Sequence, residues 1–468
     1  MSTPGGTPVC RLWAEDALLP QGWARAVLLQ WDVGGCLTQV QAGVPAPTGI
    51  ARARGPLLPG MPNLHSHAFQ RAFAGLTEWR GGASDSFWSW RQRMYAFAQR
   101  ISPEALEAIA LWAYLEMLEA GYTSVCEFHY LHHAPPGRPY ADDAAMALAL
   151  LRAARTAGIG MTLLPVLYQS GNFGVPPAPE QARFLLGTDQ LLALLQRLAP
   201  SAQAQGAALG LAPHSLRAVP PASLEAGVAG LHALLPRAPV HIHIAEQRQE
   251  LRDCLTWSGQ TPVQWLLDHA SVDARWCLVH ATHMTPRECA AAARSGAVAG
   301  LCPSTEANLG DGIFELPRWR RHGGRWGVGS DSQVCINAAE ELMLLEYGQR
   351  LRRRRRNVLA EAGEPQVATA MLLQAVAGGA QAAGRAIAGL RVGQQADFVV
   401  LDAAHVALSG LDAGSALASH VFASARSSAV RSVWVAGRPR LLPRGHMLRR
   451  QAEAAFLRAR AQLLAQRP

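Results

Sequence analysis

Lysine is absent from this sequence of 468 residues, because all 43 of its basic residues are arginines. A catalytic lysine that forms a Schiff base is therefore excluded, as is a carboxylated lysine that bridges two metal ions. The arginines outnumber the 34 acidic residues and give a net charge of +9, so a nucleic-acid partner has to be considered. However, a chain that uses only arginine and holds 43 glycines and 30 prolines is more typical of a compositional bias than of a binding surface.

Long hydrophobic runs, a secretion signal and paired cysteines are also missing. No uninterrupted apolar stretch is long enough to cross a bilayer, and the first ten residues lack the basic and apolar segments of a signal peptide. The cysteines are dispersed and form no Cys-x-x-Cys pair. We therefore expect free thiols, a reducing cytoplasmic compartment and no membrane partner. The eight cysteines are Cys10, Cys36, Cys126, Cys254, Cys277, Cys289, Cys302 and Cys335.

The sequence does contain a regular alternation of short apolar strands with helices. With 49% hydrophobic and 16% charged residues, the chain is long enough for a large core and more than one structural unit. A strand that ends at His65 and His67 is followed by seven further predicted strands, and helices separate most of them. This pattern predicts an α/β fold with a parallel (β/α)8 barrel. The seven strands are residues 123–130, 160–168, 206–213, 240–245, 276–280, 297–302 and 325–329, and predicted helices include residues 103–120, 142–157, 188–198, 221–235 and 337–356.

Both ends of the chain have strand character without this alternation. Residues 8–57 contain short strands broken by glycine and proline, and residues 386–440 return to strands. We expect these segments to close one small β-unit together, and a helix over 447–466 to end the chain. The predicted division is therefore an N-terminal β-part at 1–58, the barrel at 59–385, a C-terminal β-part at 386–445 and a final helix at 446–468.

Two histidines mark the end of the first barrel strand. Because successive side chains of a strand point to opposite faces, His65 and His67 point to the same face. Two imidazoles on one face offer half of a metal site, and zinc, iron and copper all suit imidazole. The pair alone is equally compatible with two ordinary surface histidines, so the rest of the chain has to decide.

Polar residues recur at the ends of three later strands, which is where the active sites of such barrels lie. Three imidazoles and one carboxylate drawn from these strand ends can hold a divalent metal and leave one position open for water. Independent accidents would not place all of them on successive strand ends. The candidates are His241, His243 and Glu246 after strand five, His280 and His283 after strand six, and Asp331 after strand eight.

Each of these candidates also has a purely structural interpretation. His243 is preferred over His241 because Glu246 follows it by three residues, and His280 is closer to its strand end than His283. Asp331 follows a Gly-Ser pair and is also compatible with a turn. A further histidine cluster is a weaker candidate for metal binding. It consists of His129, His132 and His133.

In these motifs the chain resembles the amidohydrolase superfamily, in the branch that deaminates cyclic or acyclic amidines with a single metal. The resemblance covers nearly the whole chain, and the first and third of its motifs are quite specific. It implies a barrel with a β-sandwich formed by both chain ends. The missing lysine agrees with a one-metal member. The motifs lie at residues 59–71, 128–132, 212–217, 241–247 and 329–332.

The resemblance implies roles for individual residues. His65, His67, His243 and Asp331 would hold one zinc ion per chain. His280 would act as the general base on the water that the metal activates, with Glu246 and Asp331 assisting proton transfer.

The resemblance also implies a homodimer and a small-molecule substrate with two carboxylates. Arg91 and Arg217 would bind the carboxylates, since the guanidinium fork suits them, and Gln70, Tyr130 and His214 would complete the pocket. From the residues alone, Arg91 is also compatible with a surface cation packed on a neighbouring tryptophan, and Tyr130 with a packed aromatic at a strand end.

Three alternatives remain open. Another zinc aminohydrolase of this branch would act on guanine, cytosine or a related heterocycle, but it would not need two arginines for carboxylates. A non-catalytic scaffold should have lost metal ligands, and none is lost. A nucleic-acid-binding protein would use the run Arg352 to Arg356. We favour a solvated helix end for this run, because no aromatic residues interleave the arginines.

Overall fold

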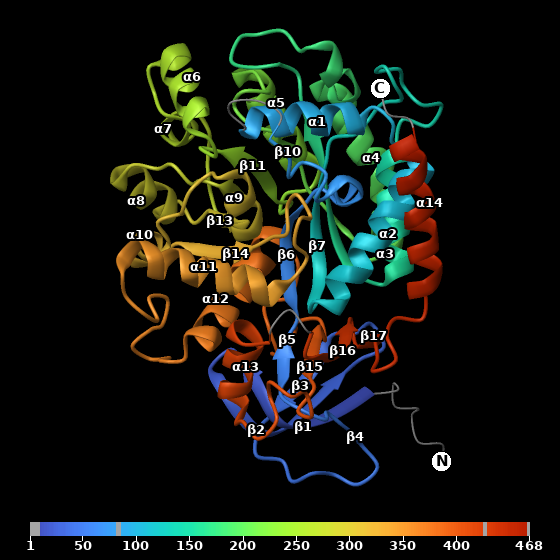
Figure 1. Ribbon diagram of the computed structural model, residues 1–468, viewed down its shortest axis with the longest axis vertical. Helices are drawn as coiled ribbons and strands as arrows, with labels where there is room; N and C mark the ends of the chain where they lie inside the picture. Colours follow the sequence, from blue (N-terminus) through green and yellow to red (C-terminus); the bar gives the residue numbers. More distant parts are fainter. Residues whose placement is uncertain (1–9, 81–85, 425–427, 466–468) are drawn as a thin grey trace.

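The computed structural model describes residues 10–80, 86–424 and 428–465 (Figure 1). The outermost parts of the predicted N-terminal β-part and final helix, residues 1–9 and 466–468, lie outside the described residues. Within the described part, parallel strands and helices occupy the middle of the chain, and an antiparallel sheet joins its two ends.

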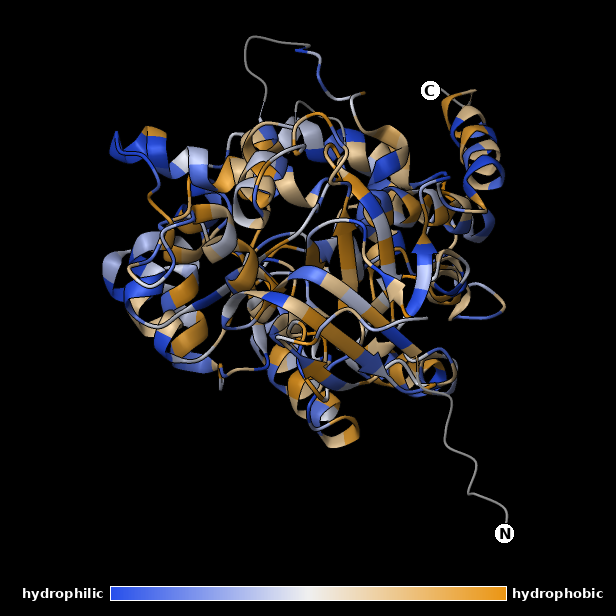
Figure 2. Ribbon diagram, turned by 90° about the horizontal axis from the view of Figure 1, so that it is seen from below, coloured by the Kyte–Doolittle hydropathy of each residue, from blue (hydrophilic) through white to orange (hydrophobic). Residues whose placement is uncertain are grey.

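The middle of the chain builds two parallel sheets, with the orders β10-β8-β7-β6 and β11-β12-β13-β14; β9 pairs with β8. Nearly all of their residues are buried, as expected for parallel strands that are covered on both faces. Figure 2 shows hydrophobic residues along the central strands and hydrophilic residues scattered over the surrounding helices. The strands are β6 (Met61–Ser66), β7 (Tyr122–His129), β8 (Gly160–Leu167), β9 (Ala208–Leu209), β10 (Ala212–Pro213), β11 (Val240–Ile244), β12 (Trp276–His280), β13 (Val298–Leu301) and β14 (Arg325–Val328).

Parallel bridges join the two sheets at both seams. At one seam Leu211 pairs with Val240. At the other Ser66 pairs with Asp331, whose backbone N–H donates to the carbonyl of His65 at 3.0 Å. The described strands therefore close on themselves, consistent with the predicted TIM-like barrel.

The predicted strand at 206–213 is interrupted between β9 and β10. A Cβ atom at Gly210 would lie 2.4 Å from the carbonyl oxygen of Pro239, so the backbones approach too closely there for a larger residue. The break nevertheless keeps both pieces beside β8, so this seam of the barrel stays closed.

Helices follow most barrel strands and cover the outside of the barrel (Figure 1). Helix α12, which was not predicted from the sequence, packs against β14, β6 and β13. No helix within the described ranges is long and apolar enough to cross a membrane. The helices of the barrel region are α1 (Phe87–Ala98), α2 (Pro103–Glu119), α3 (Ala145–Ala157), α4 (Thr188–Ala204), α5 (Pro221–Leu234), α6 (Arg248–Ser258), α7 (Pro262–His269), α8 (Pro286–Arg294), α9 (Pro303–Leu309), α10 (Leu316–Arg321), α11 (Ala338–Arg353) and α12 (Val367–Ala383), with 3-10 turns η1 (Ala68–Phe73) and η2 (Pro179–Phe184).

The two chain ends share one eight-stranded sheet at the far end of the molecule from α6 (Figure 1). Strand β5 from the N-terminal part pairs antiparallel with β15 from the C-terminal part, so the joint β-unit predicted from the sequence is present. The strand pairings form a single sheet, whereas the predicted sandwich needs two layers. Its strands are β1 (Cys10–Leu19), β2 (Gly22–Trp31), β3 (Leu37–Gln41), β4 (Ala51–Arg52), β5 (Leu57–Pro59), β15 (Phe398–Leu401), β16 (Val430–Val435) and β17 (Arg438–Leu441).

The last two helices pack back onto the barrel region. Helix α13 (Ala413–Phe422) contacts α11 and α12, and α14 (Arg449–Ala465) contacts α2. On α14, Phe456 stacks on Trp112 of α2 with ring centroids 5.9 Å apart. The C-terminal helix is therefore part of the packed molecule.

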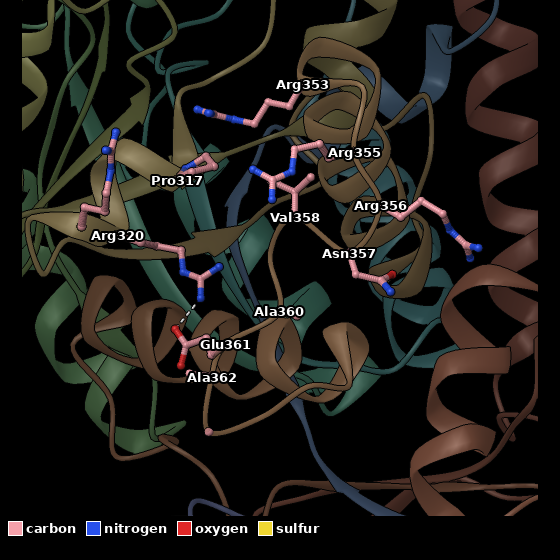
Figure 3. Close-up of a pocket in the computed structure, with 12 residues that line it drawn as sticks. Pro317, Arg320, Arg353, Arg355, Arg356, Asn357, Val358, Ala360, Glu361 and Ala362 are labelled. Carbon is pink, nitrogen blue, oxygen red and sulfur yellow. Dashed lines mark hydrogen bonds and ion pairs between the residues drawn. The ribbon is translucent and has the colours of Figure 1, made fainter.

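The run Arg352 to Arg356 lies at the end of α11, beside a hollow of the surface (Figure 3). Helix α11 ends at Arg353, three residues before the predicted end, because Arg354 adopts a left-handed conformation with φ 52°. Arg352 and Arg353 both pair with Glu315, at 2.7 and 2.9 Å. Part of the run therefore has carboxylate partners within the chain, and its predicted role as a solvated helix end stays a prediction.

Candidate functional site

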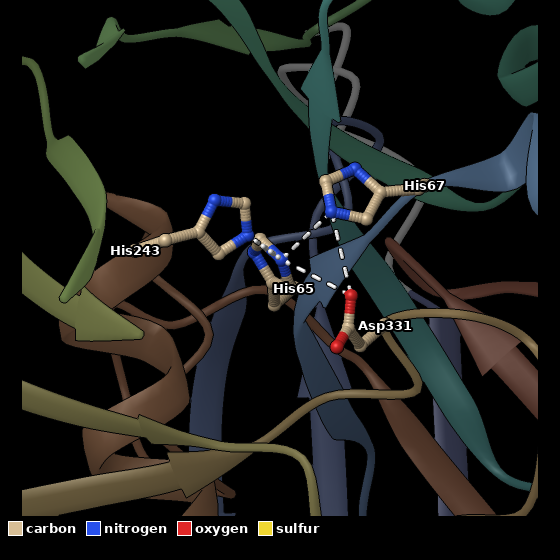
Figure 4. A group of neighbouring side chains, drawn as sticks. All are labelled: His65, His67, His243 and Asp331. Carbon is tan, nitrogen blue, oxygen red and sulfur yellow. Dashed lines mark hydrogen bonds and ion pairs between the residues drawn. The ribbon is translucent and has the colours of Figure 1, made fainter. Parts of the chain in front are cut away.

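Four side chains from three parts of the barrel converge at the carboxyl ends of its strands (Figure 4). His65 lies in β6 just before its last residue, His67 follows that strand, His243 lies in β11 and Asp331 follows β14. The Nε2 atom of His65 lies 3.2 Å from that of His67 and 3.0 Å from that of His243. Asp331 Oδ1 lies 3.4 Å from the Nε2 atoms of both His65 and His67. The structure thus brings together the four residues that the sequence predicted as metal ligands.

Hydrogen bonds orient two of these imidazoles. His67 Nδ1 lies 2.9 Å from the carbonyl oxygen of Phe128, and His243 Nδ1 lies 3.1 Å from that of His214. A carbonyl oxygen only accepts, so Nδ1 carries the proton in each ring and the lone pair is on Nε2. The lone pairs therefore point at the shared centre.

The surroundings also keep the ligand imidazoles neutral. Burial lowers the pKa of His65 to about 3 and lowers the pKa values of His67 and His243 as well. Neutral imidazole is the form that binds metals. Three neutral Nε2 donors and one carboxylate fit a divalent metal, with imidazole favouring zinc, copper, iron or nickel over calcium or magnesium.

His280 lies beside the metal donors and is surrounded by three carboxylates. Its Nδ1 atom lies 3.3 Å from Glu306, while its Nε2 atom lies 3.8 Å from Glu246 and 3.7 Å from Asp331. Burial alone would lower the pKa of His280, but these carboxylates outweigh burial and raise it to about 10. Burial raises the pKa of Glu246 to about 7, although His280 and Arg217 oppose that shift. These carboxylates therefore hold a proton on His280 in preference to Glu246, and a divalent cation bound beside the ring would oppose them by lowering the pKa of His280.

The backbone is strained where these side chains leave the strands. His280 has φ 66° and Asp331 has φ 43°, and Ala245, just before Glu246, has φ 51°. These left-handed conformations are unfavourable for residues other than glycine. Such strain is found where the surrounding structure fixes a side chain for function.

Most of the site residues predicted from the sequence line one cavity. Aromatic and apolar side chains that were not predicted from the sequence line it as well. The predicted residues on it are His67, Gln70, Arg91, Tyr130, His214, Arg217, His243, Glu246, His280 and Asp331, and the additional ones are Phe87, Trp90, Met94, Tyr95, Tyr168, Phe184 and Leu309.

Two arginines form the cationic side of this cavity. Arg217 is 4% exposed, and its Nε atom has no hydrogen-bond partner within the described part of the chain. Arg91 comes from α1 and lies 4.4 Å above the Trp88 ring, while Arg217 lies 5.8 Å from the same ring. Burial lowers the pKa of Arg91, and the nearby charge of Arg217 lowers it further. Two like charges on one cavity, one buried and one half-buried, favour an anionic ligand.

Gln70, Tyr130 and His214 line the same cavity as the two arginines. Gln70 Nε2 donates to the Tyr130 hydroxyl at 3.1 Å, and its Oε1 atom has no partner among the described residues. Burial and the charge of Arg217 lower the pKa of His214, so this imidazole is neutral. These groups offer neutral hydrogen bonds to a ligand, and their predicted roles stay predictions.

Three of the other candidate histidines have structural partners. His241 Nε2 donates to the carbonyl of Ala382 at 2.8 Å. In the second cluster, His132 and His133 bond to backbone carbonyls at 2.9 and 2.7 Å. Neither His241, His283 nor the second cluster belongs to a group of metal donors in the ranges that the structure describes.

Two carboxylates near the site were not predicted from the sequence. Glu306 accepts from the backbone N–H of Cys302 at 2.9 Å and faces His280. Glu127 accepts from the backbone N–H of Ala68 and from Ser66, both at 2.7 Å, and so fixes the turn that carries His67. The segment Pro303-Ser-Thr-Glu306 directly after the seventh predicted strand was the available signal for Glu306.

Comparison with known proteins gives consistent results at the levels of family, sequence and structure. The model of the amidohydrolase family matches residues 57–440. The chain is 51% identical over 454 residues to formimidoylglutamate deiminase of Pseudomonas aeruginosa, which covers 97% of this chain and 99% of that protein. It is 28% identical to 5-methylthioadenosine/S-adenosylhomocysteine deaminase of Shouchella clausii, over 82% of this chain and 80% of that protein. The crystal structure of an amidohydrolase from Brucella melitensis has a TM-score of 0.92 and 47% identity, covering 97% of this chain and 100% of that chain.

Proposed function

We propose that this chain, which belongs to the amidohydrolase family, is a formimidoylglutamate deiminase. The enzyme hydrolyses N-formimidoyl-L-glutamate to N-formyl-L-glutamate and ammonia. The observation that carries this proposal is that Arg91 and Arg217 face the same cavity as a four-donor metal cluster. The 51% identity to formimidoylglutamate deiminase over almost the whole of both chains supports the same activity.

His65, His67, His243 and Asp331 hold the metal in this proposal, and the metal is zinc, one ion per chain. Their three neutral imidazoles and one carboxylate are a donor set that suits zinc. When bound, the ion acts as a Lewis acid and makes water acidic enough to lose a proton near neutral pH.

His280 is the general base. Its Nε2 atom faces Glu246 and Asp331, while Glu306 holds the opposite ring nitrogen. This nitrogen accepts a proton from the water as its oxygen bonds to the formimino carbon. Glu246 and Asp331 assist the transfer of a proton to the terminal nitrogen of the substrate, which then leaves as ammonia when its bond to carbon breaks.

Arg91 and Arg217 bind the two carboxylates of the substrate. Arg217 is buried and its Nε atom has no hydrogen-bond partner in the described ranges, so a substrate carboxylate would supply the hydrogen bond that this guanidinium lacks. Gln70, Tyr130 and His214 complete the pocket beside the reacting carbon. A neutral purine or pyrimidine has no carboxylate for either guanidinium group to bind, which disfavours the heterocyclic alternative. All predicted ligands are present, which disfavours a non-catalytic scaffold.

The proposal extends to the whole molecule and its setting. The chain divides at residues 58, 385 and 445, with a β-sandwich built from both ends around the barrel. The enzyme is a homodimer that acts in histidine degradation on a small molecule and not on nucleic acid. The eight cysteines are all free, which supports a cytoplasmic location.

The test is ammonia release by the purified protein. Turnover of N-formimidoyl-L-glutamate should be efficient, with N-formyl-L-glutamate as the second product, and guanine and cytosine should not be deaminated at a useful rate. Efficient turnover of either base, with none of the formimino compound, would move the protein to the heterocyclic branch.

A further inference from the structure

A second group of possible metal donors lies against the first. His280, Cys302 and Asp331 are all buried, and their donor atoms lie within 4.8 Å of one another. We propose that these three residues bind a second divalent cation of the thiophilic class, such as Cd²⁺ or excess Zn²⁺, and that this cation inhibits the enzyme. This site goes beyond the proposed function, in which one metal and no thiol take part.

The two oxygens of Asp331 face different partners. Oδ1 lies 3.4 Å from the Nε2 atoms of His65 and His67, in the first group. Oδ2 lies 3.7 Å from the Nε2 atom of His280, in the second group. One carboxylate can therefore serve both groups at the same time, so filling the second does not require emptying the first.

His280 is already turned toward the second group. Its Nδ1 atom is held by Glu306 at 3.3 Å, which leaves Nε2 as the nitrogen for a cation. The carboxylates of Glu246, Glu306 and Asp331 all face this ring, at 3.3 to 3.8 Å. This concentration of negative charge in a buried place favours a cation.

Cys302 supplies the donor that selects the cation. It follows β13, is fully buried, and its thiol makes no hydrogen bond within the described part of the chain. Thiolate, imidazole and carboxylate together favour soft divalent ions over magnesium or calcium. Binding releases the thiol proton to solvent and forms a sulfur–metal bond, so no oxidant or reductant is needed.

Occupation of this site should stop turnover. The cation takes the Nε2 lone pair of His280, which is the lone pair that accepts the proton from water in the proposed reaction. Inhibition should therefore appear together with binding of the second equivalent, and removal of that equivalent should restore turnover.

The experiment titrates the protein that carries one equivalent of zinc with CdCl2. Equilibrium dialysis counts the bound cations, ultraviolet absorption reports sulfur-to-cadmium charge transfer, and ammonia release reports turnover. The parent should bind one further equivalent with new absorption and a parallel loss of turnover. Cys302→Ser should lose the absorption and bind the second equivalent at least tenfold more weakly, while retaining the first metal.

Cys277→Ser is the matched control, because Cys277 is also fully buried, in the adjacent strand β12, but belongs to neither donor group. It should behave like the parent. His280→Asn tests the same site from its other side and should lose the second equivalent while keeping the first. The more exposed thiols give a background common to all variants.

Absorption that persists in Cys302→Ser, or a parent that binds no second equivalent, would overturn the proposal. If Cys302→Ser does not retain the first metal, the result for His280→Asn decides. Stoichiometry and absorption do not depend on the substrate, so the second site and the deiminase activity can fail separately.

Discussion

Arg217 and Arg91 are the two residues on which we propose that substrate choice depends. A charge-assisted hydrogen bond is worth roughly 1.5–3 kcal/mol, so Arg217→Met or Arg91→Met should lower kcat/KM for N-formimidoyl-L-glutamate by about ten- to a hundredfold. The loss should be much smaller for a formimino compound that lacks the matching carboxylate. Steady-state kinetics of each variant on both substrates measures the difference.

Arg93→Met is the control for these variants. Arg93 is also on α1, but it packs on Trp79, bonds to the carbonyl of Thr77 and does not line the cavity. Its kinetics should stay close to those of the parent. Small and equal losses on both substrates for Arg91→Met and Arg217→Met would mean that these arginines are structural.

His280 and His243 are predicted to differ in metal content when replaced. His280→Asn should abolish turnover and retain the metal, because His280 is proposed to act as a base, whereas His243→Asn should lose both. His241→Asn is the control, since His241 lies on the same strand as His243 but bonds to Ala382. Elemental analysis of the folded variants checks this, and a metal-free His280→Asn protein would show that His280 is a ligand.

At the scale of elements, helix α1 positions both arginines through Trp88. Each guanidinium interacts with the face of this indole, at 4.4 Å for Arg91 and 5.8 Å for Arg217. A cation–π contact contributes roughly 0.5–2 kcal/mol, so Trp88→Leu should raise KM about two- to thirtyfold with little change in kcat. Trp79→Leu removes a cation–π contact outside the cavity and should change neither constant. A loss confined to kcat would contradict this positioning role.

The contact between α9 and α11 should make stability depend on pH. Glu341 of α11 accepts hydrogen bonds from the backbone N–H and hydroxyl of Ser304, and burial raises its pKa to about 8. Between the ordinary pKa near 4.5 and about 8, only the folded protein holds this proton. This group therefore lowers the free energy of unfolding as pH rises through that range, by about 1.4 kcal/mol per unit at most.

Glu341→Gln removes this titration. The free energy of unfolding from denaturant melts should become less dependent on pH between 5 and 8 than in the parent. Glu340→Gln is the control, because Glu340 is the neighbouring helix residue and is not fully buried. Parallel pH profiles for parent and Glu341→Gln would contradict the assignment.

The elements themselves were largely predictable, and their differences have local causes. Strand β7 and helix α2 agree with the sequence to within one residue, because their apolar patterns and the Ser102 cap are local signals. Helix α3 begins at Ala145 and not at 142, since the Asp142 carboxylate accepts from the N–H of Ala144 and holds a turn. The split at Gly210 depends on Pro239 from another strand, and a distant contact of this kind has no local signal.

At the scale of the whole molecule, the barrel explains which site residues could be predicted. His65, His243 and Asp331 lie at strand ends, so their convergence follows from the order of the strands. Glu306 and Trp88 act through other side chains, and their positions depend on how a helix packs over the barrel mouth. The segment after the seventh strand points to Glu306 as a polar residue at the barrel mouth, but no motif in the sequence indicates which side chains Glu306 and Trp88 contact.

Because the strand ends bring the four donors together, the number of bound metal ions links the barrel fold to the proposed reaction. Zinc should be added back in steps to metal-stripped protein while kcat/KM for N-formimidoyl-L-glutamate is measured. We predict no turnover before zinc is added and a linear rise that ends at one equivalent per chain. Turnover by the stripped protein, or a rise that continues to two equivalents, would contradict a one-metal deiminase built on His65, His67, His243 and Asp331.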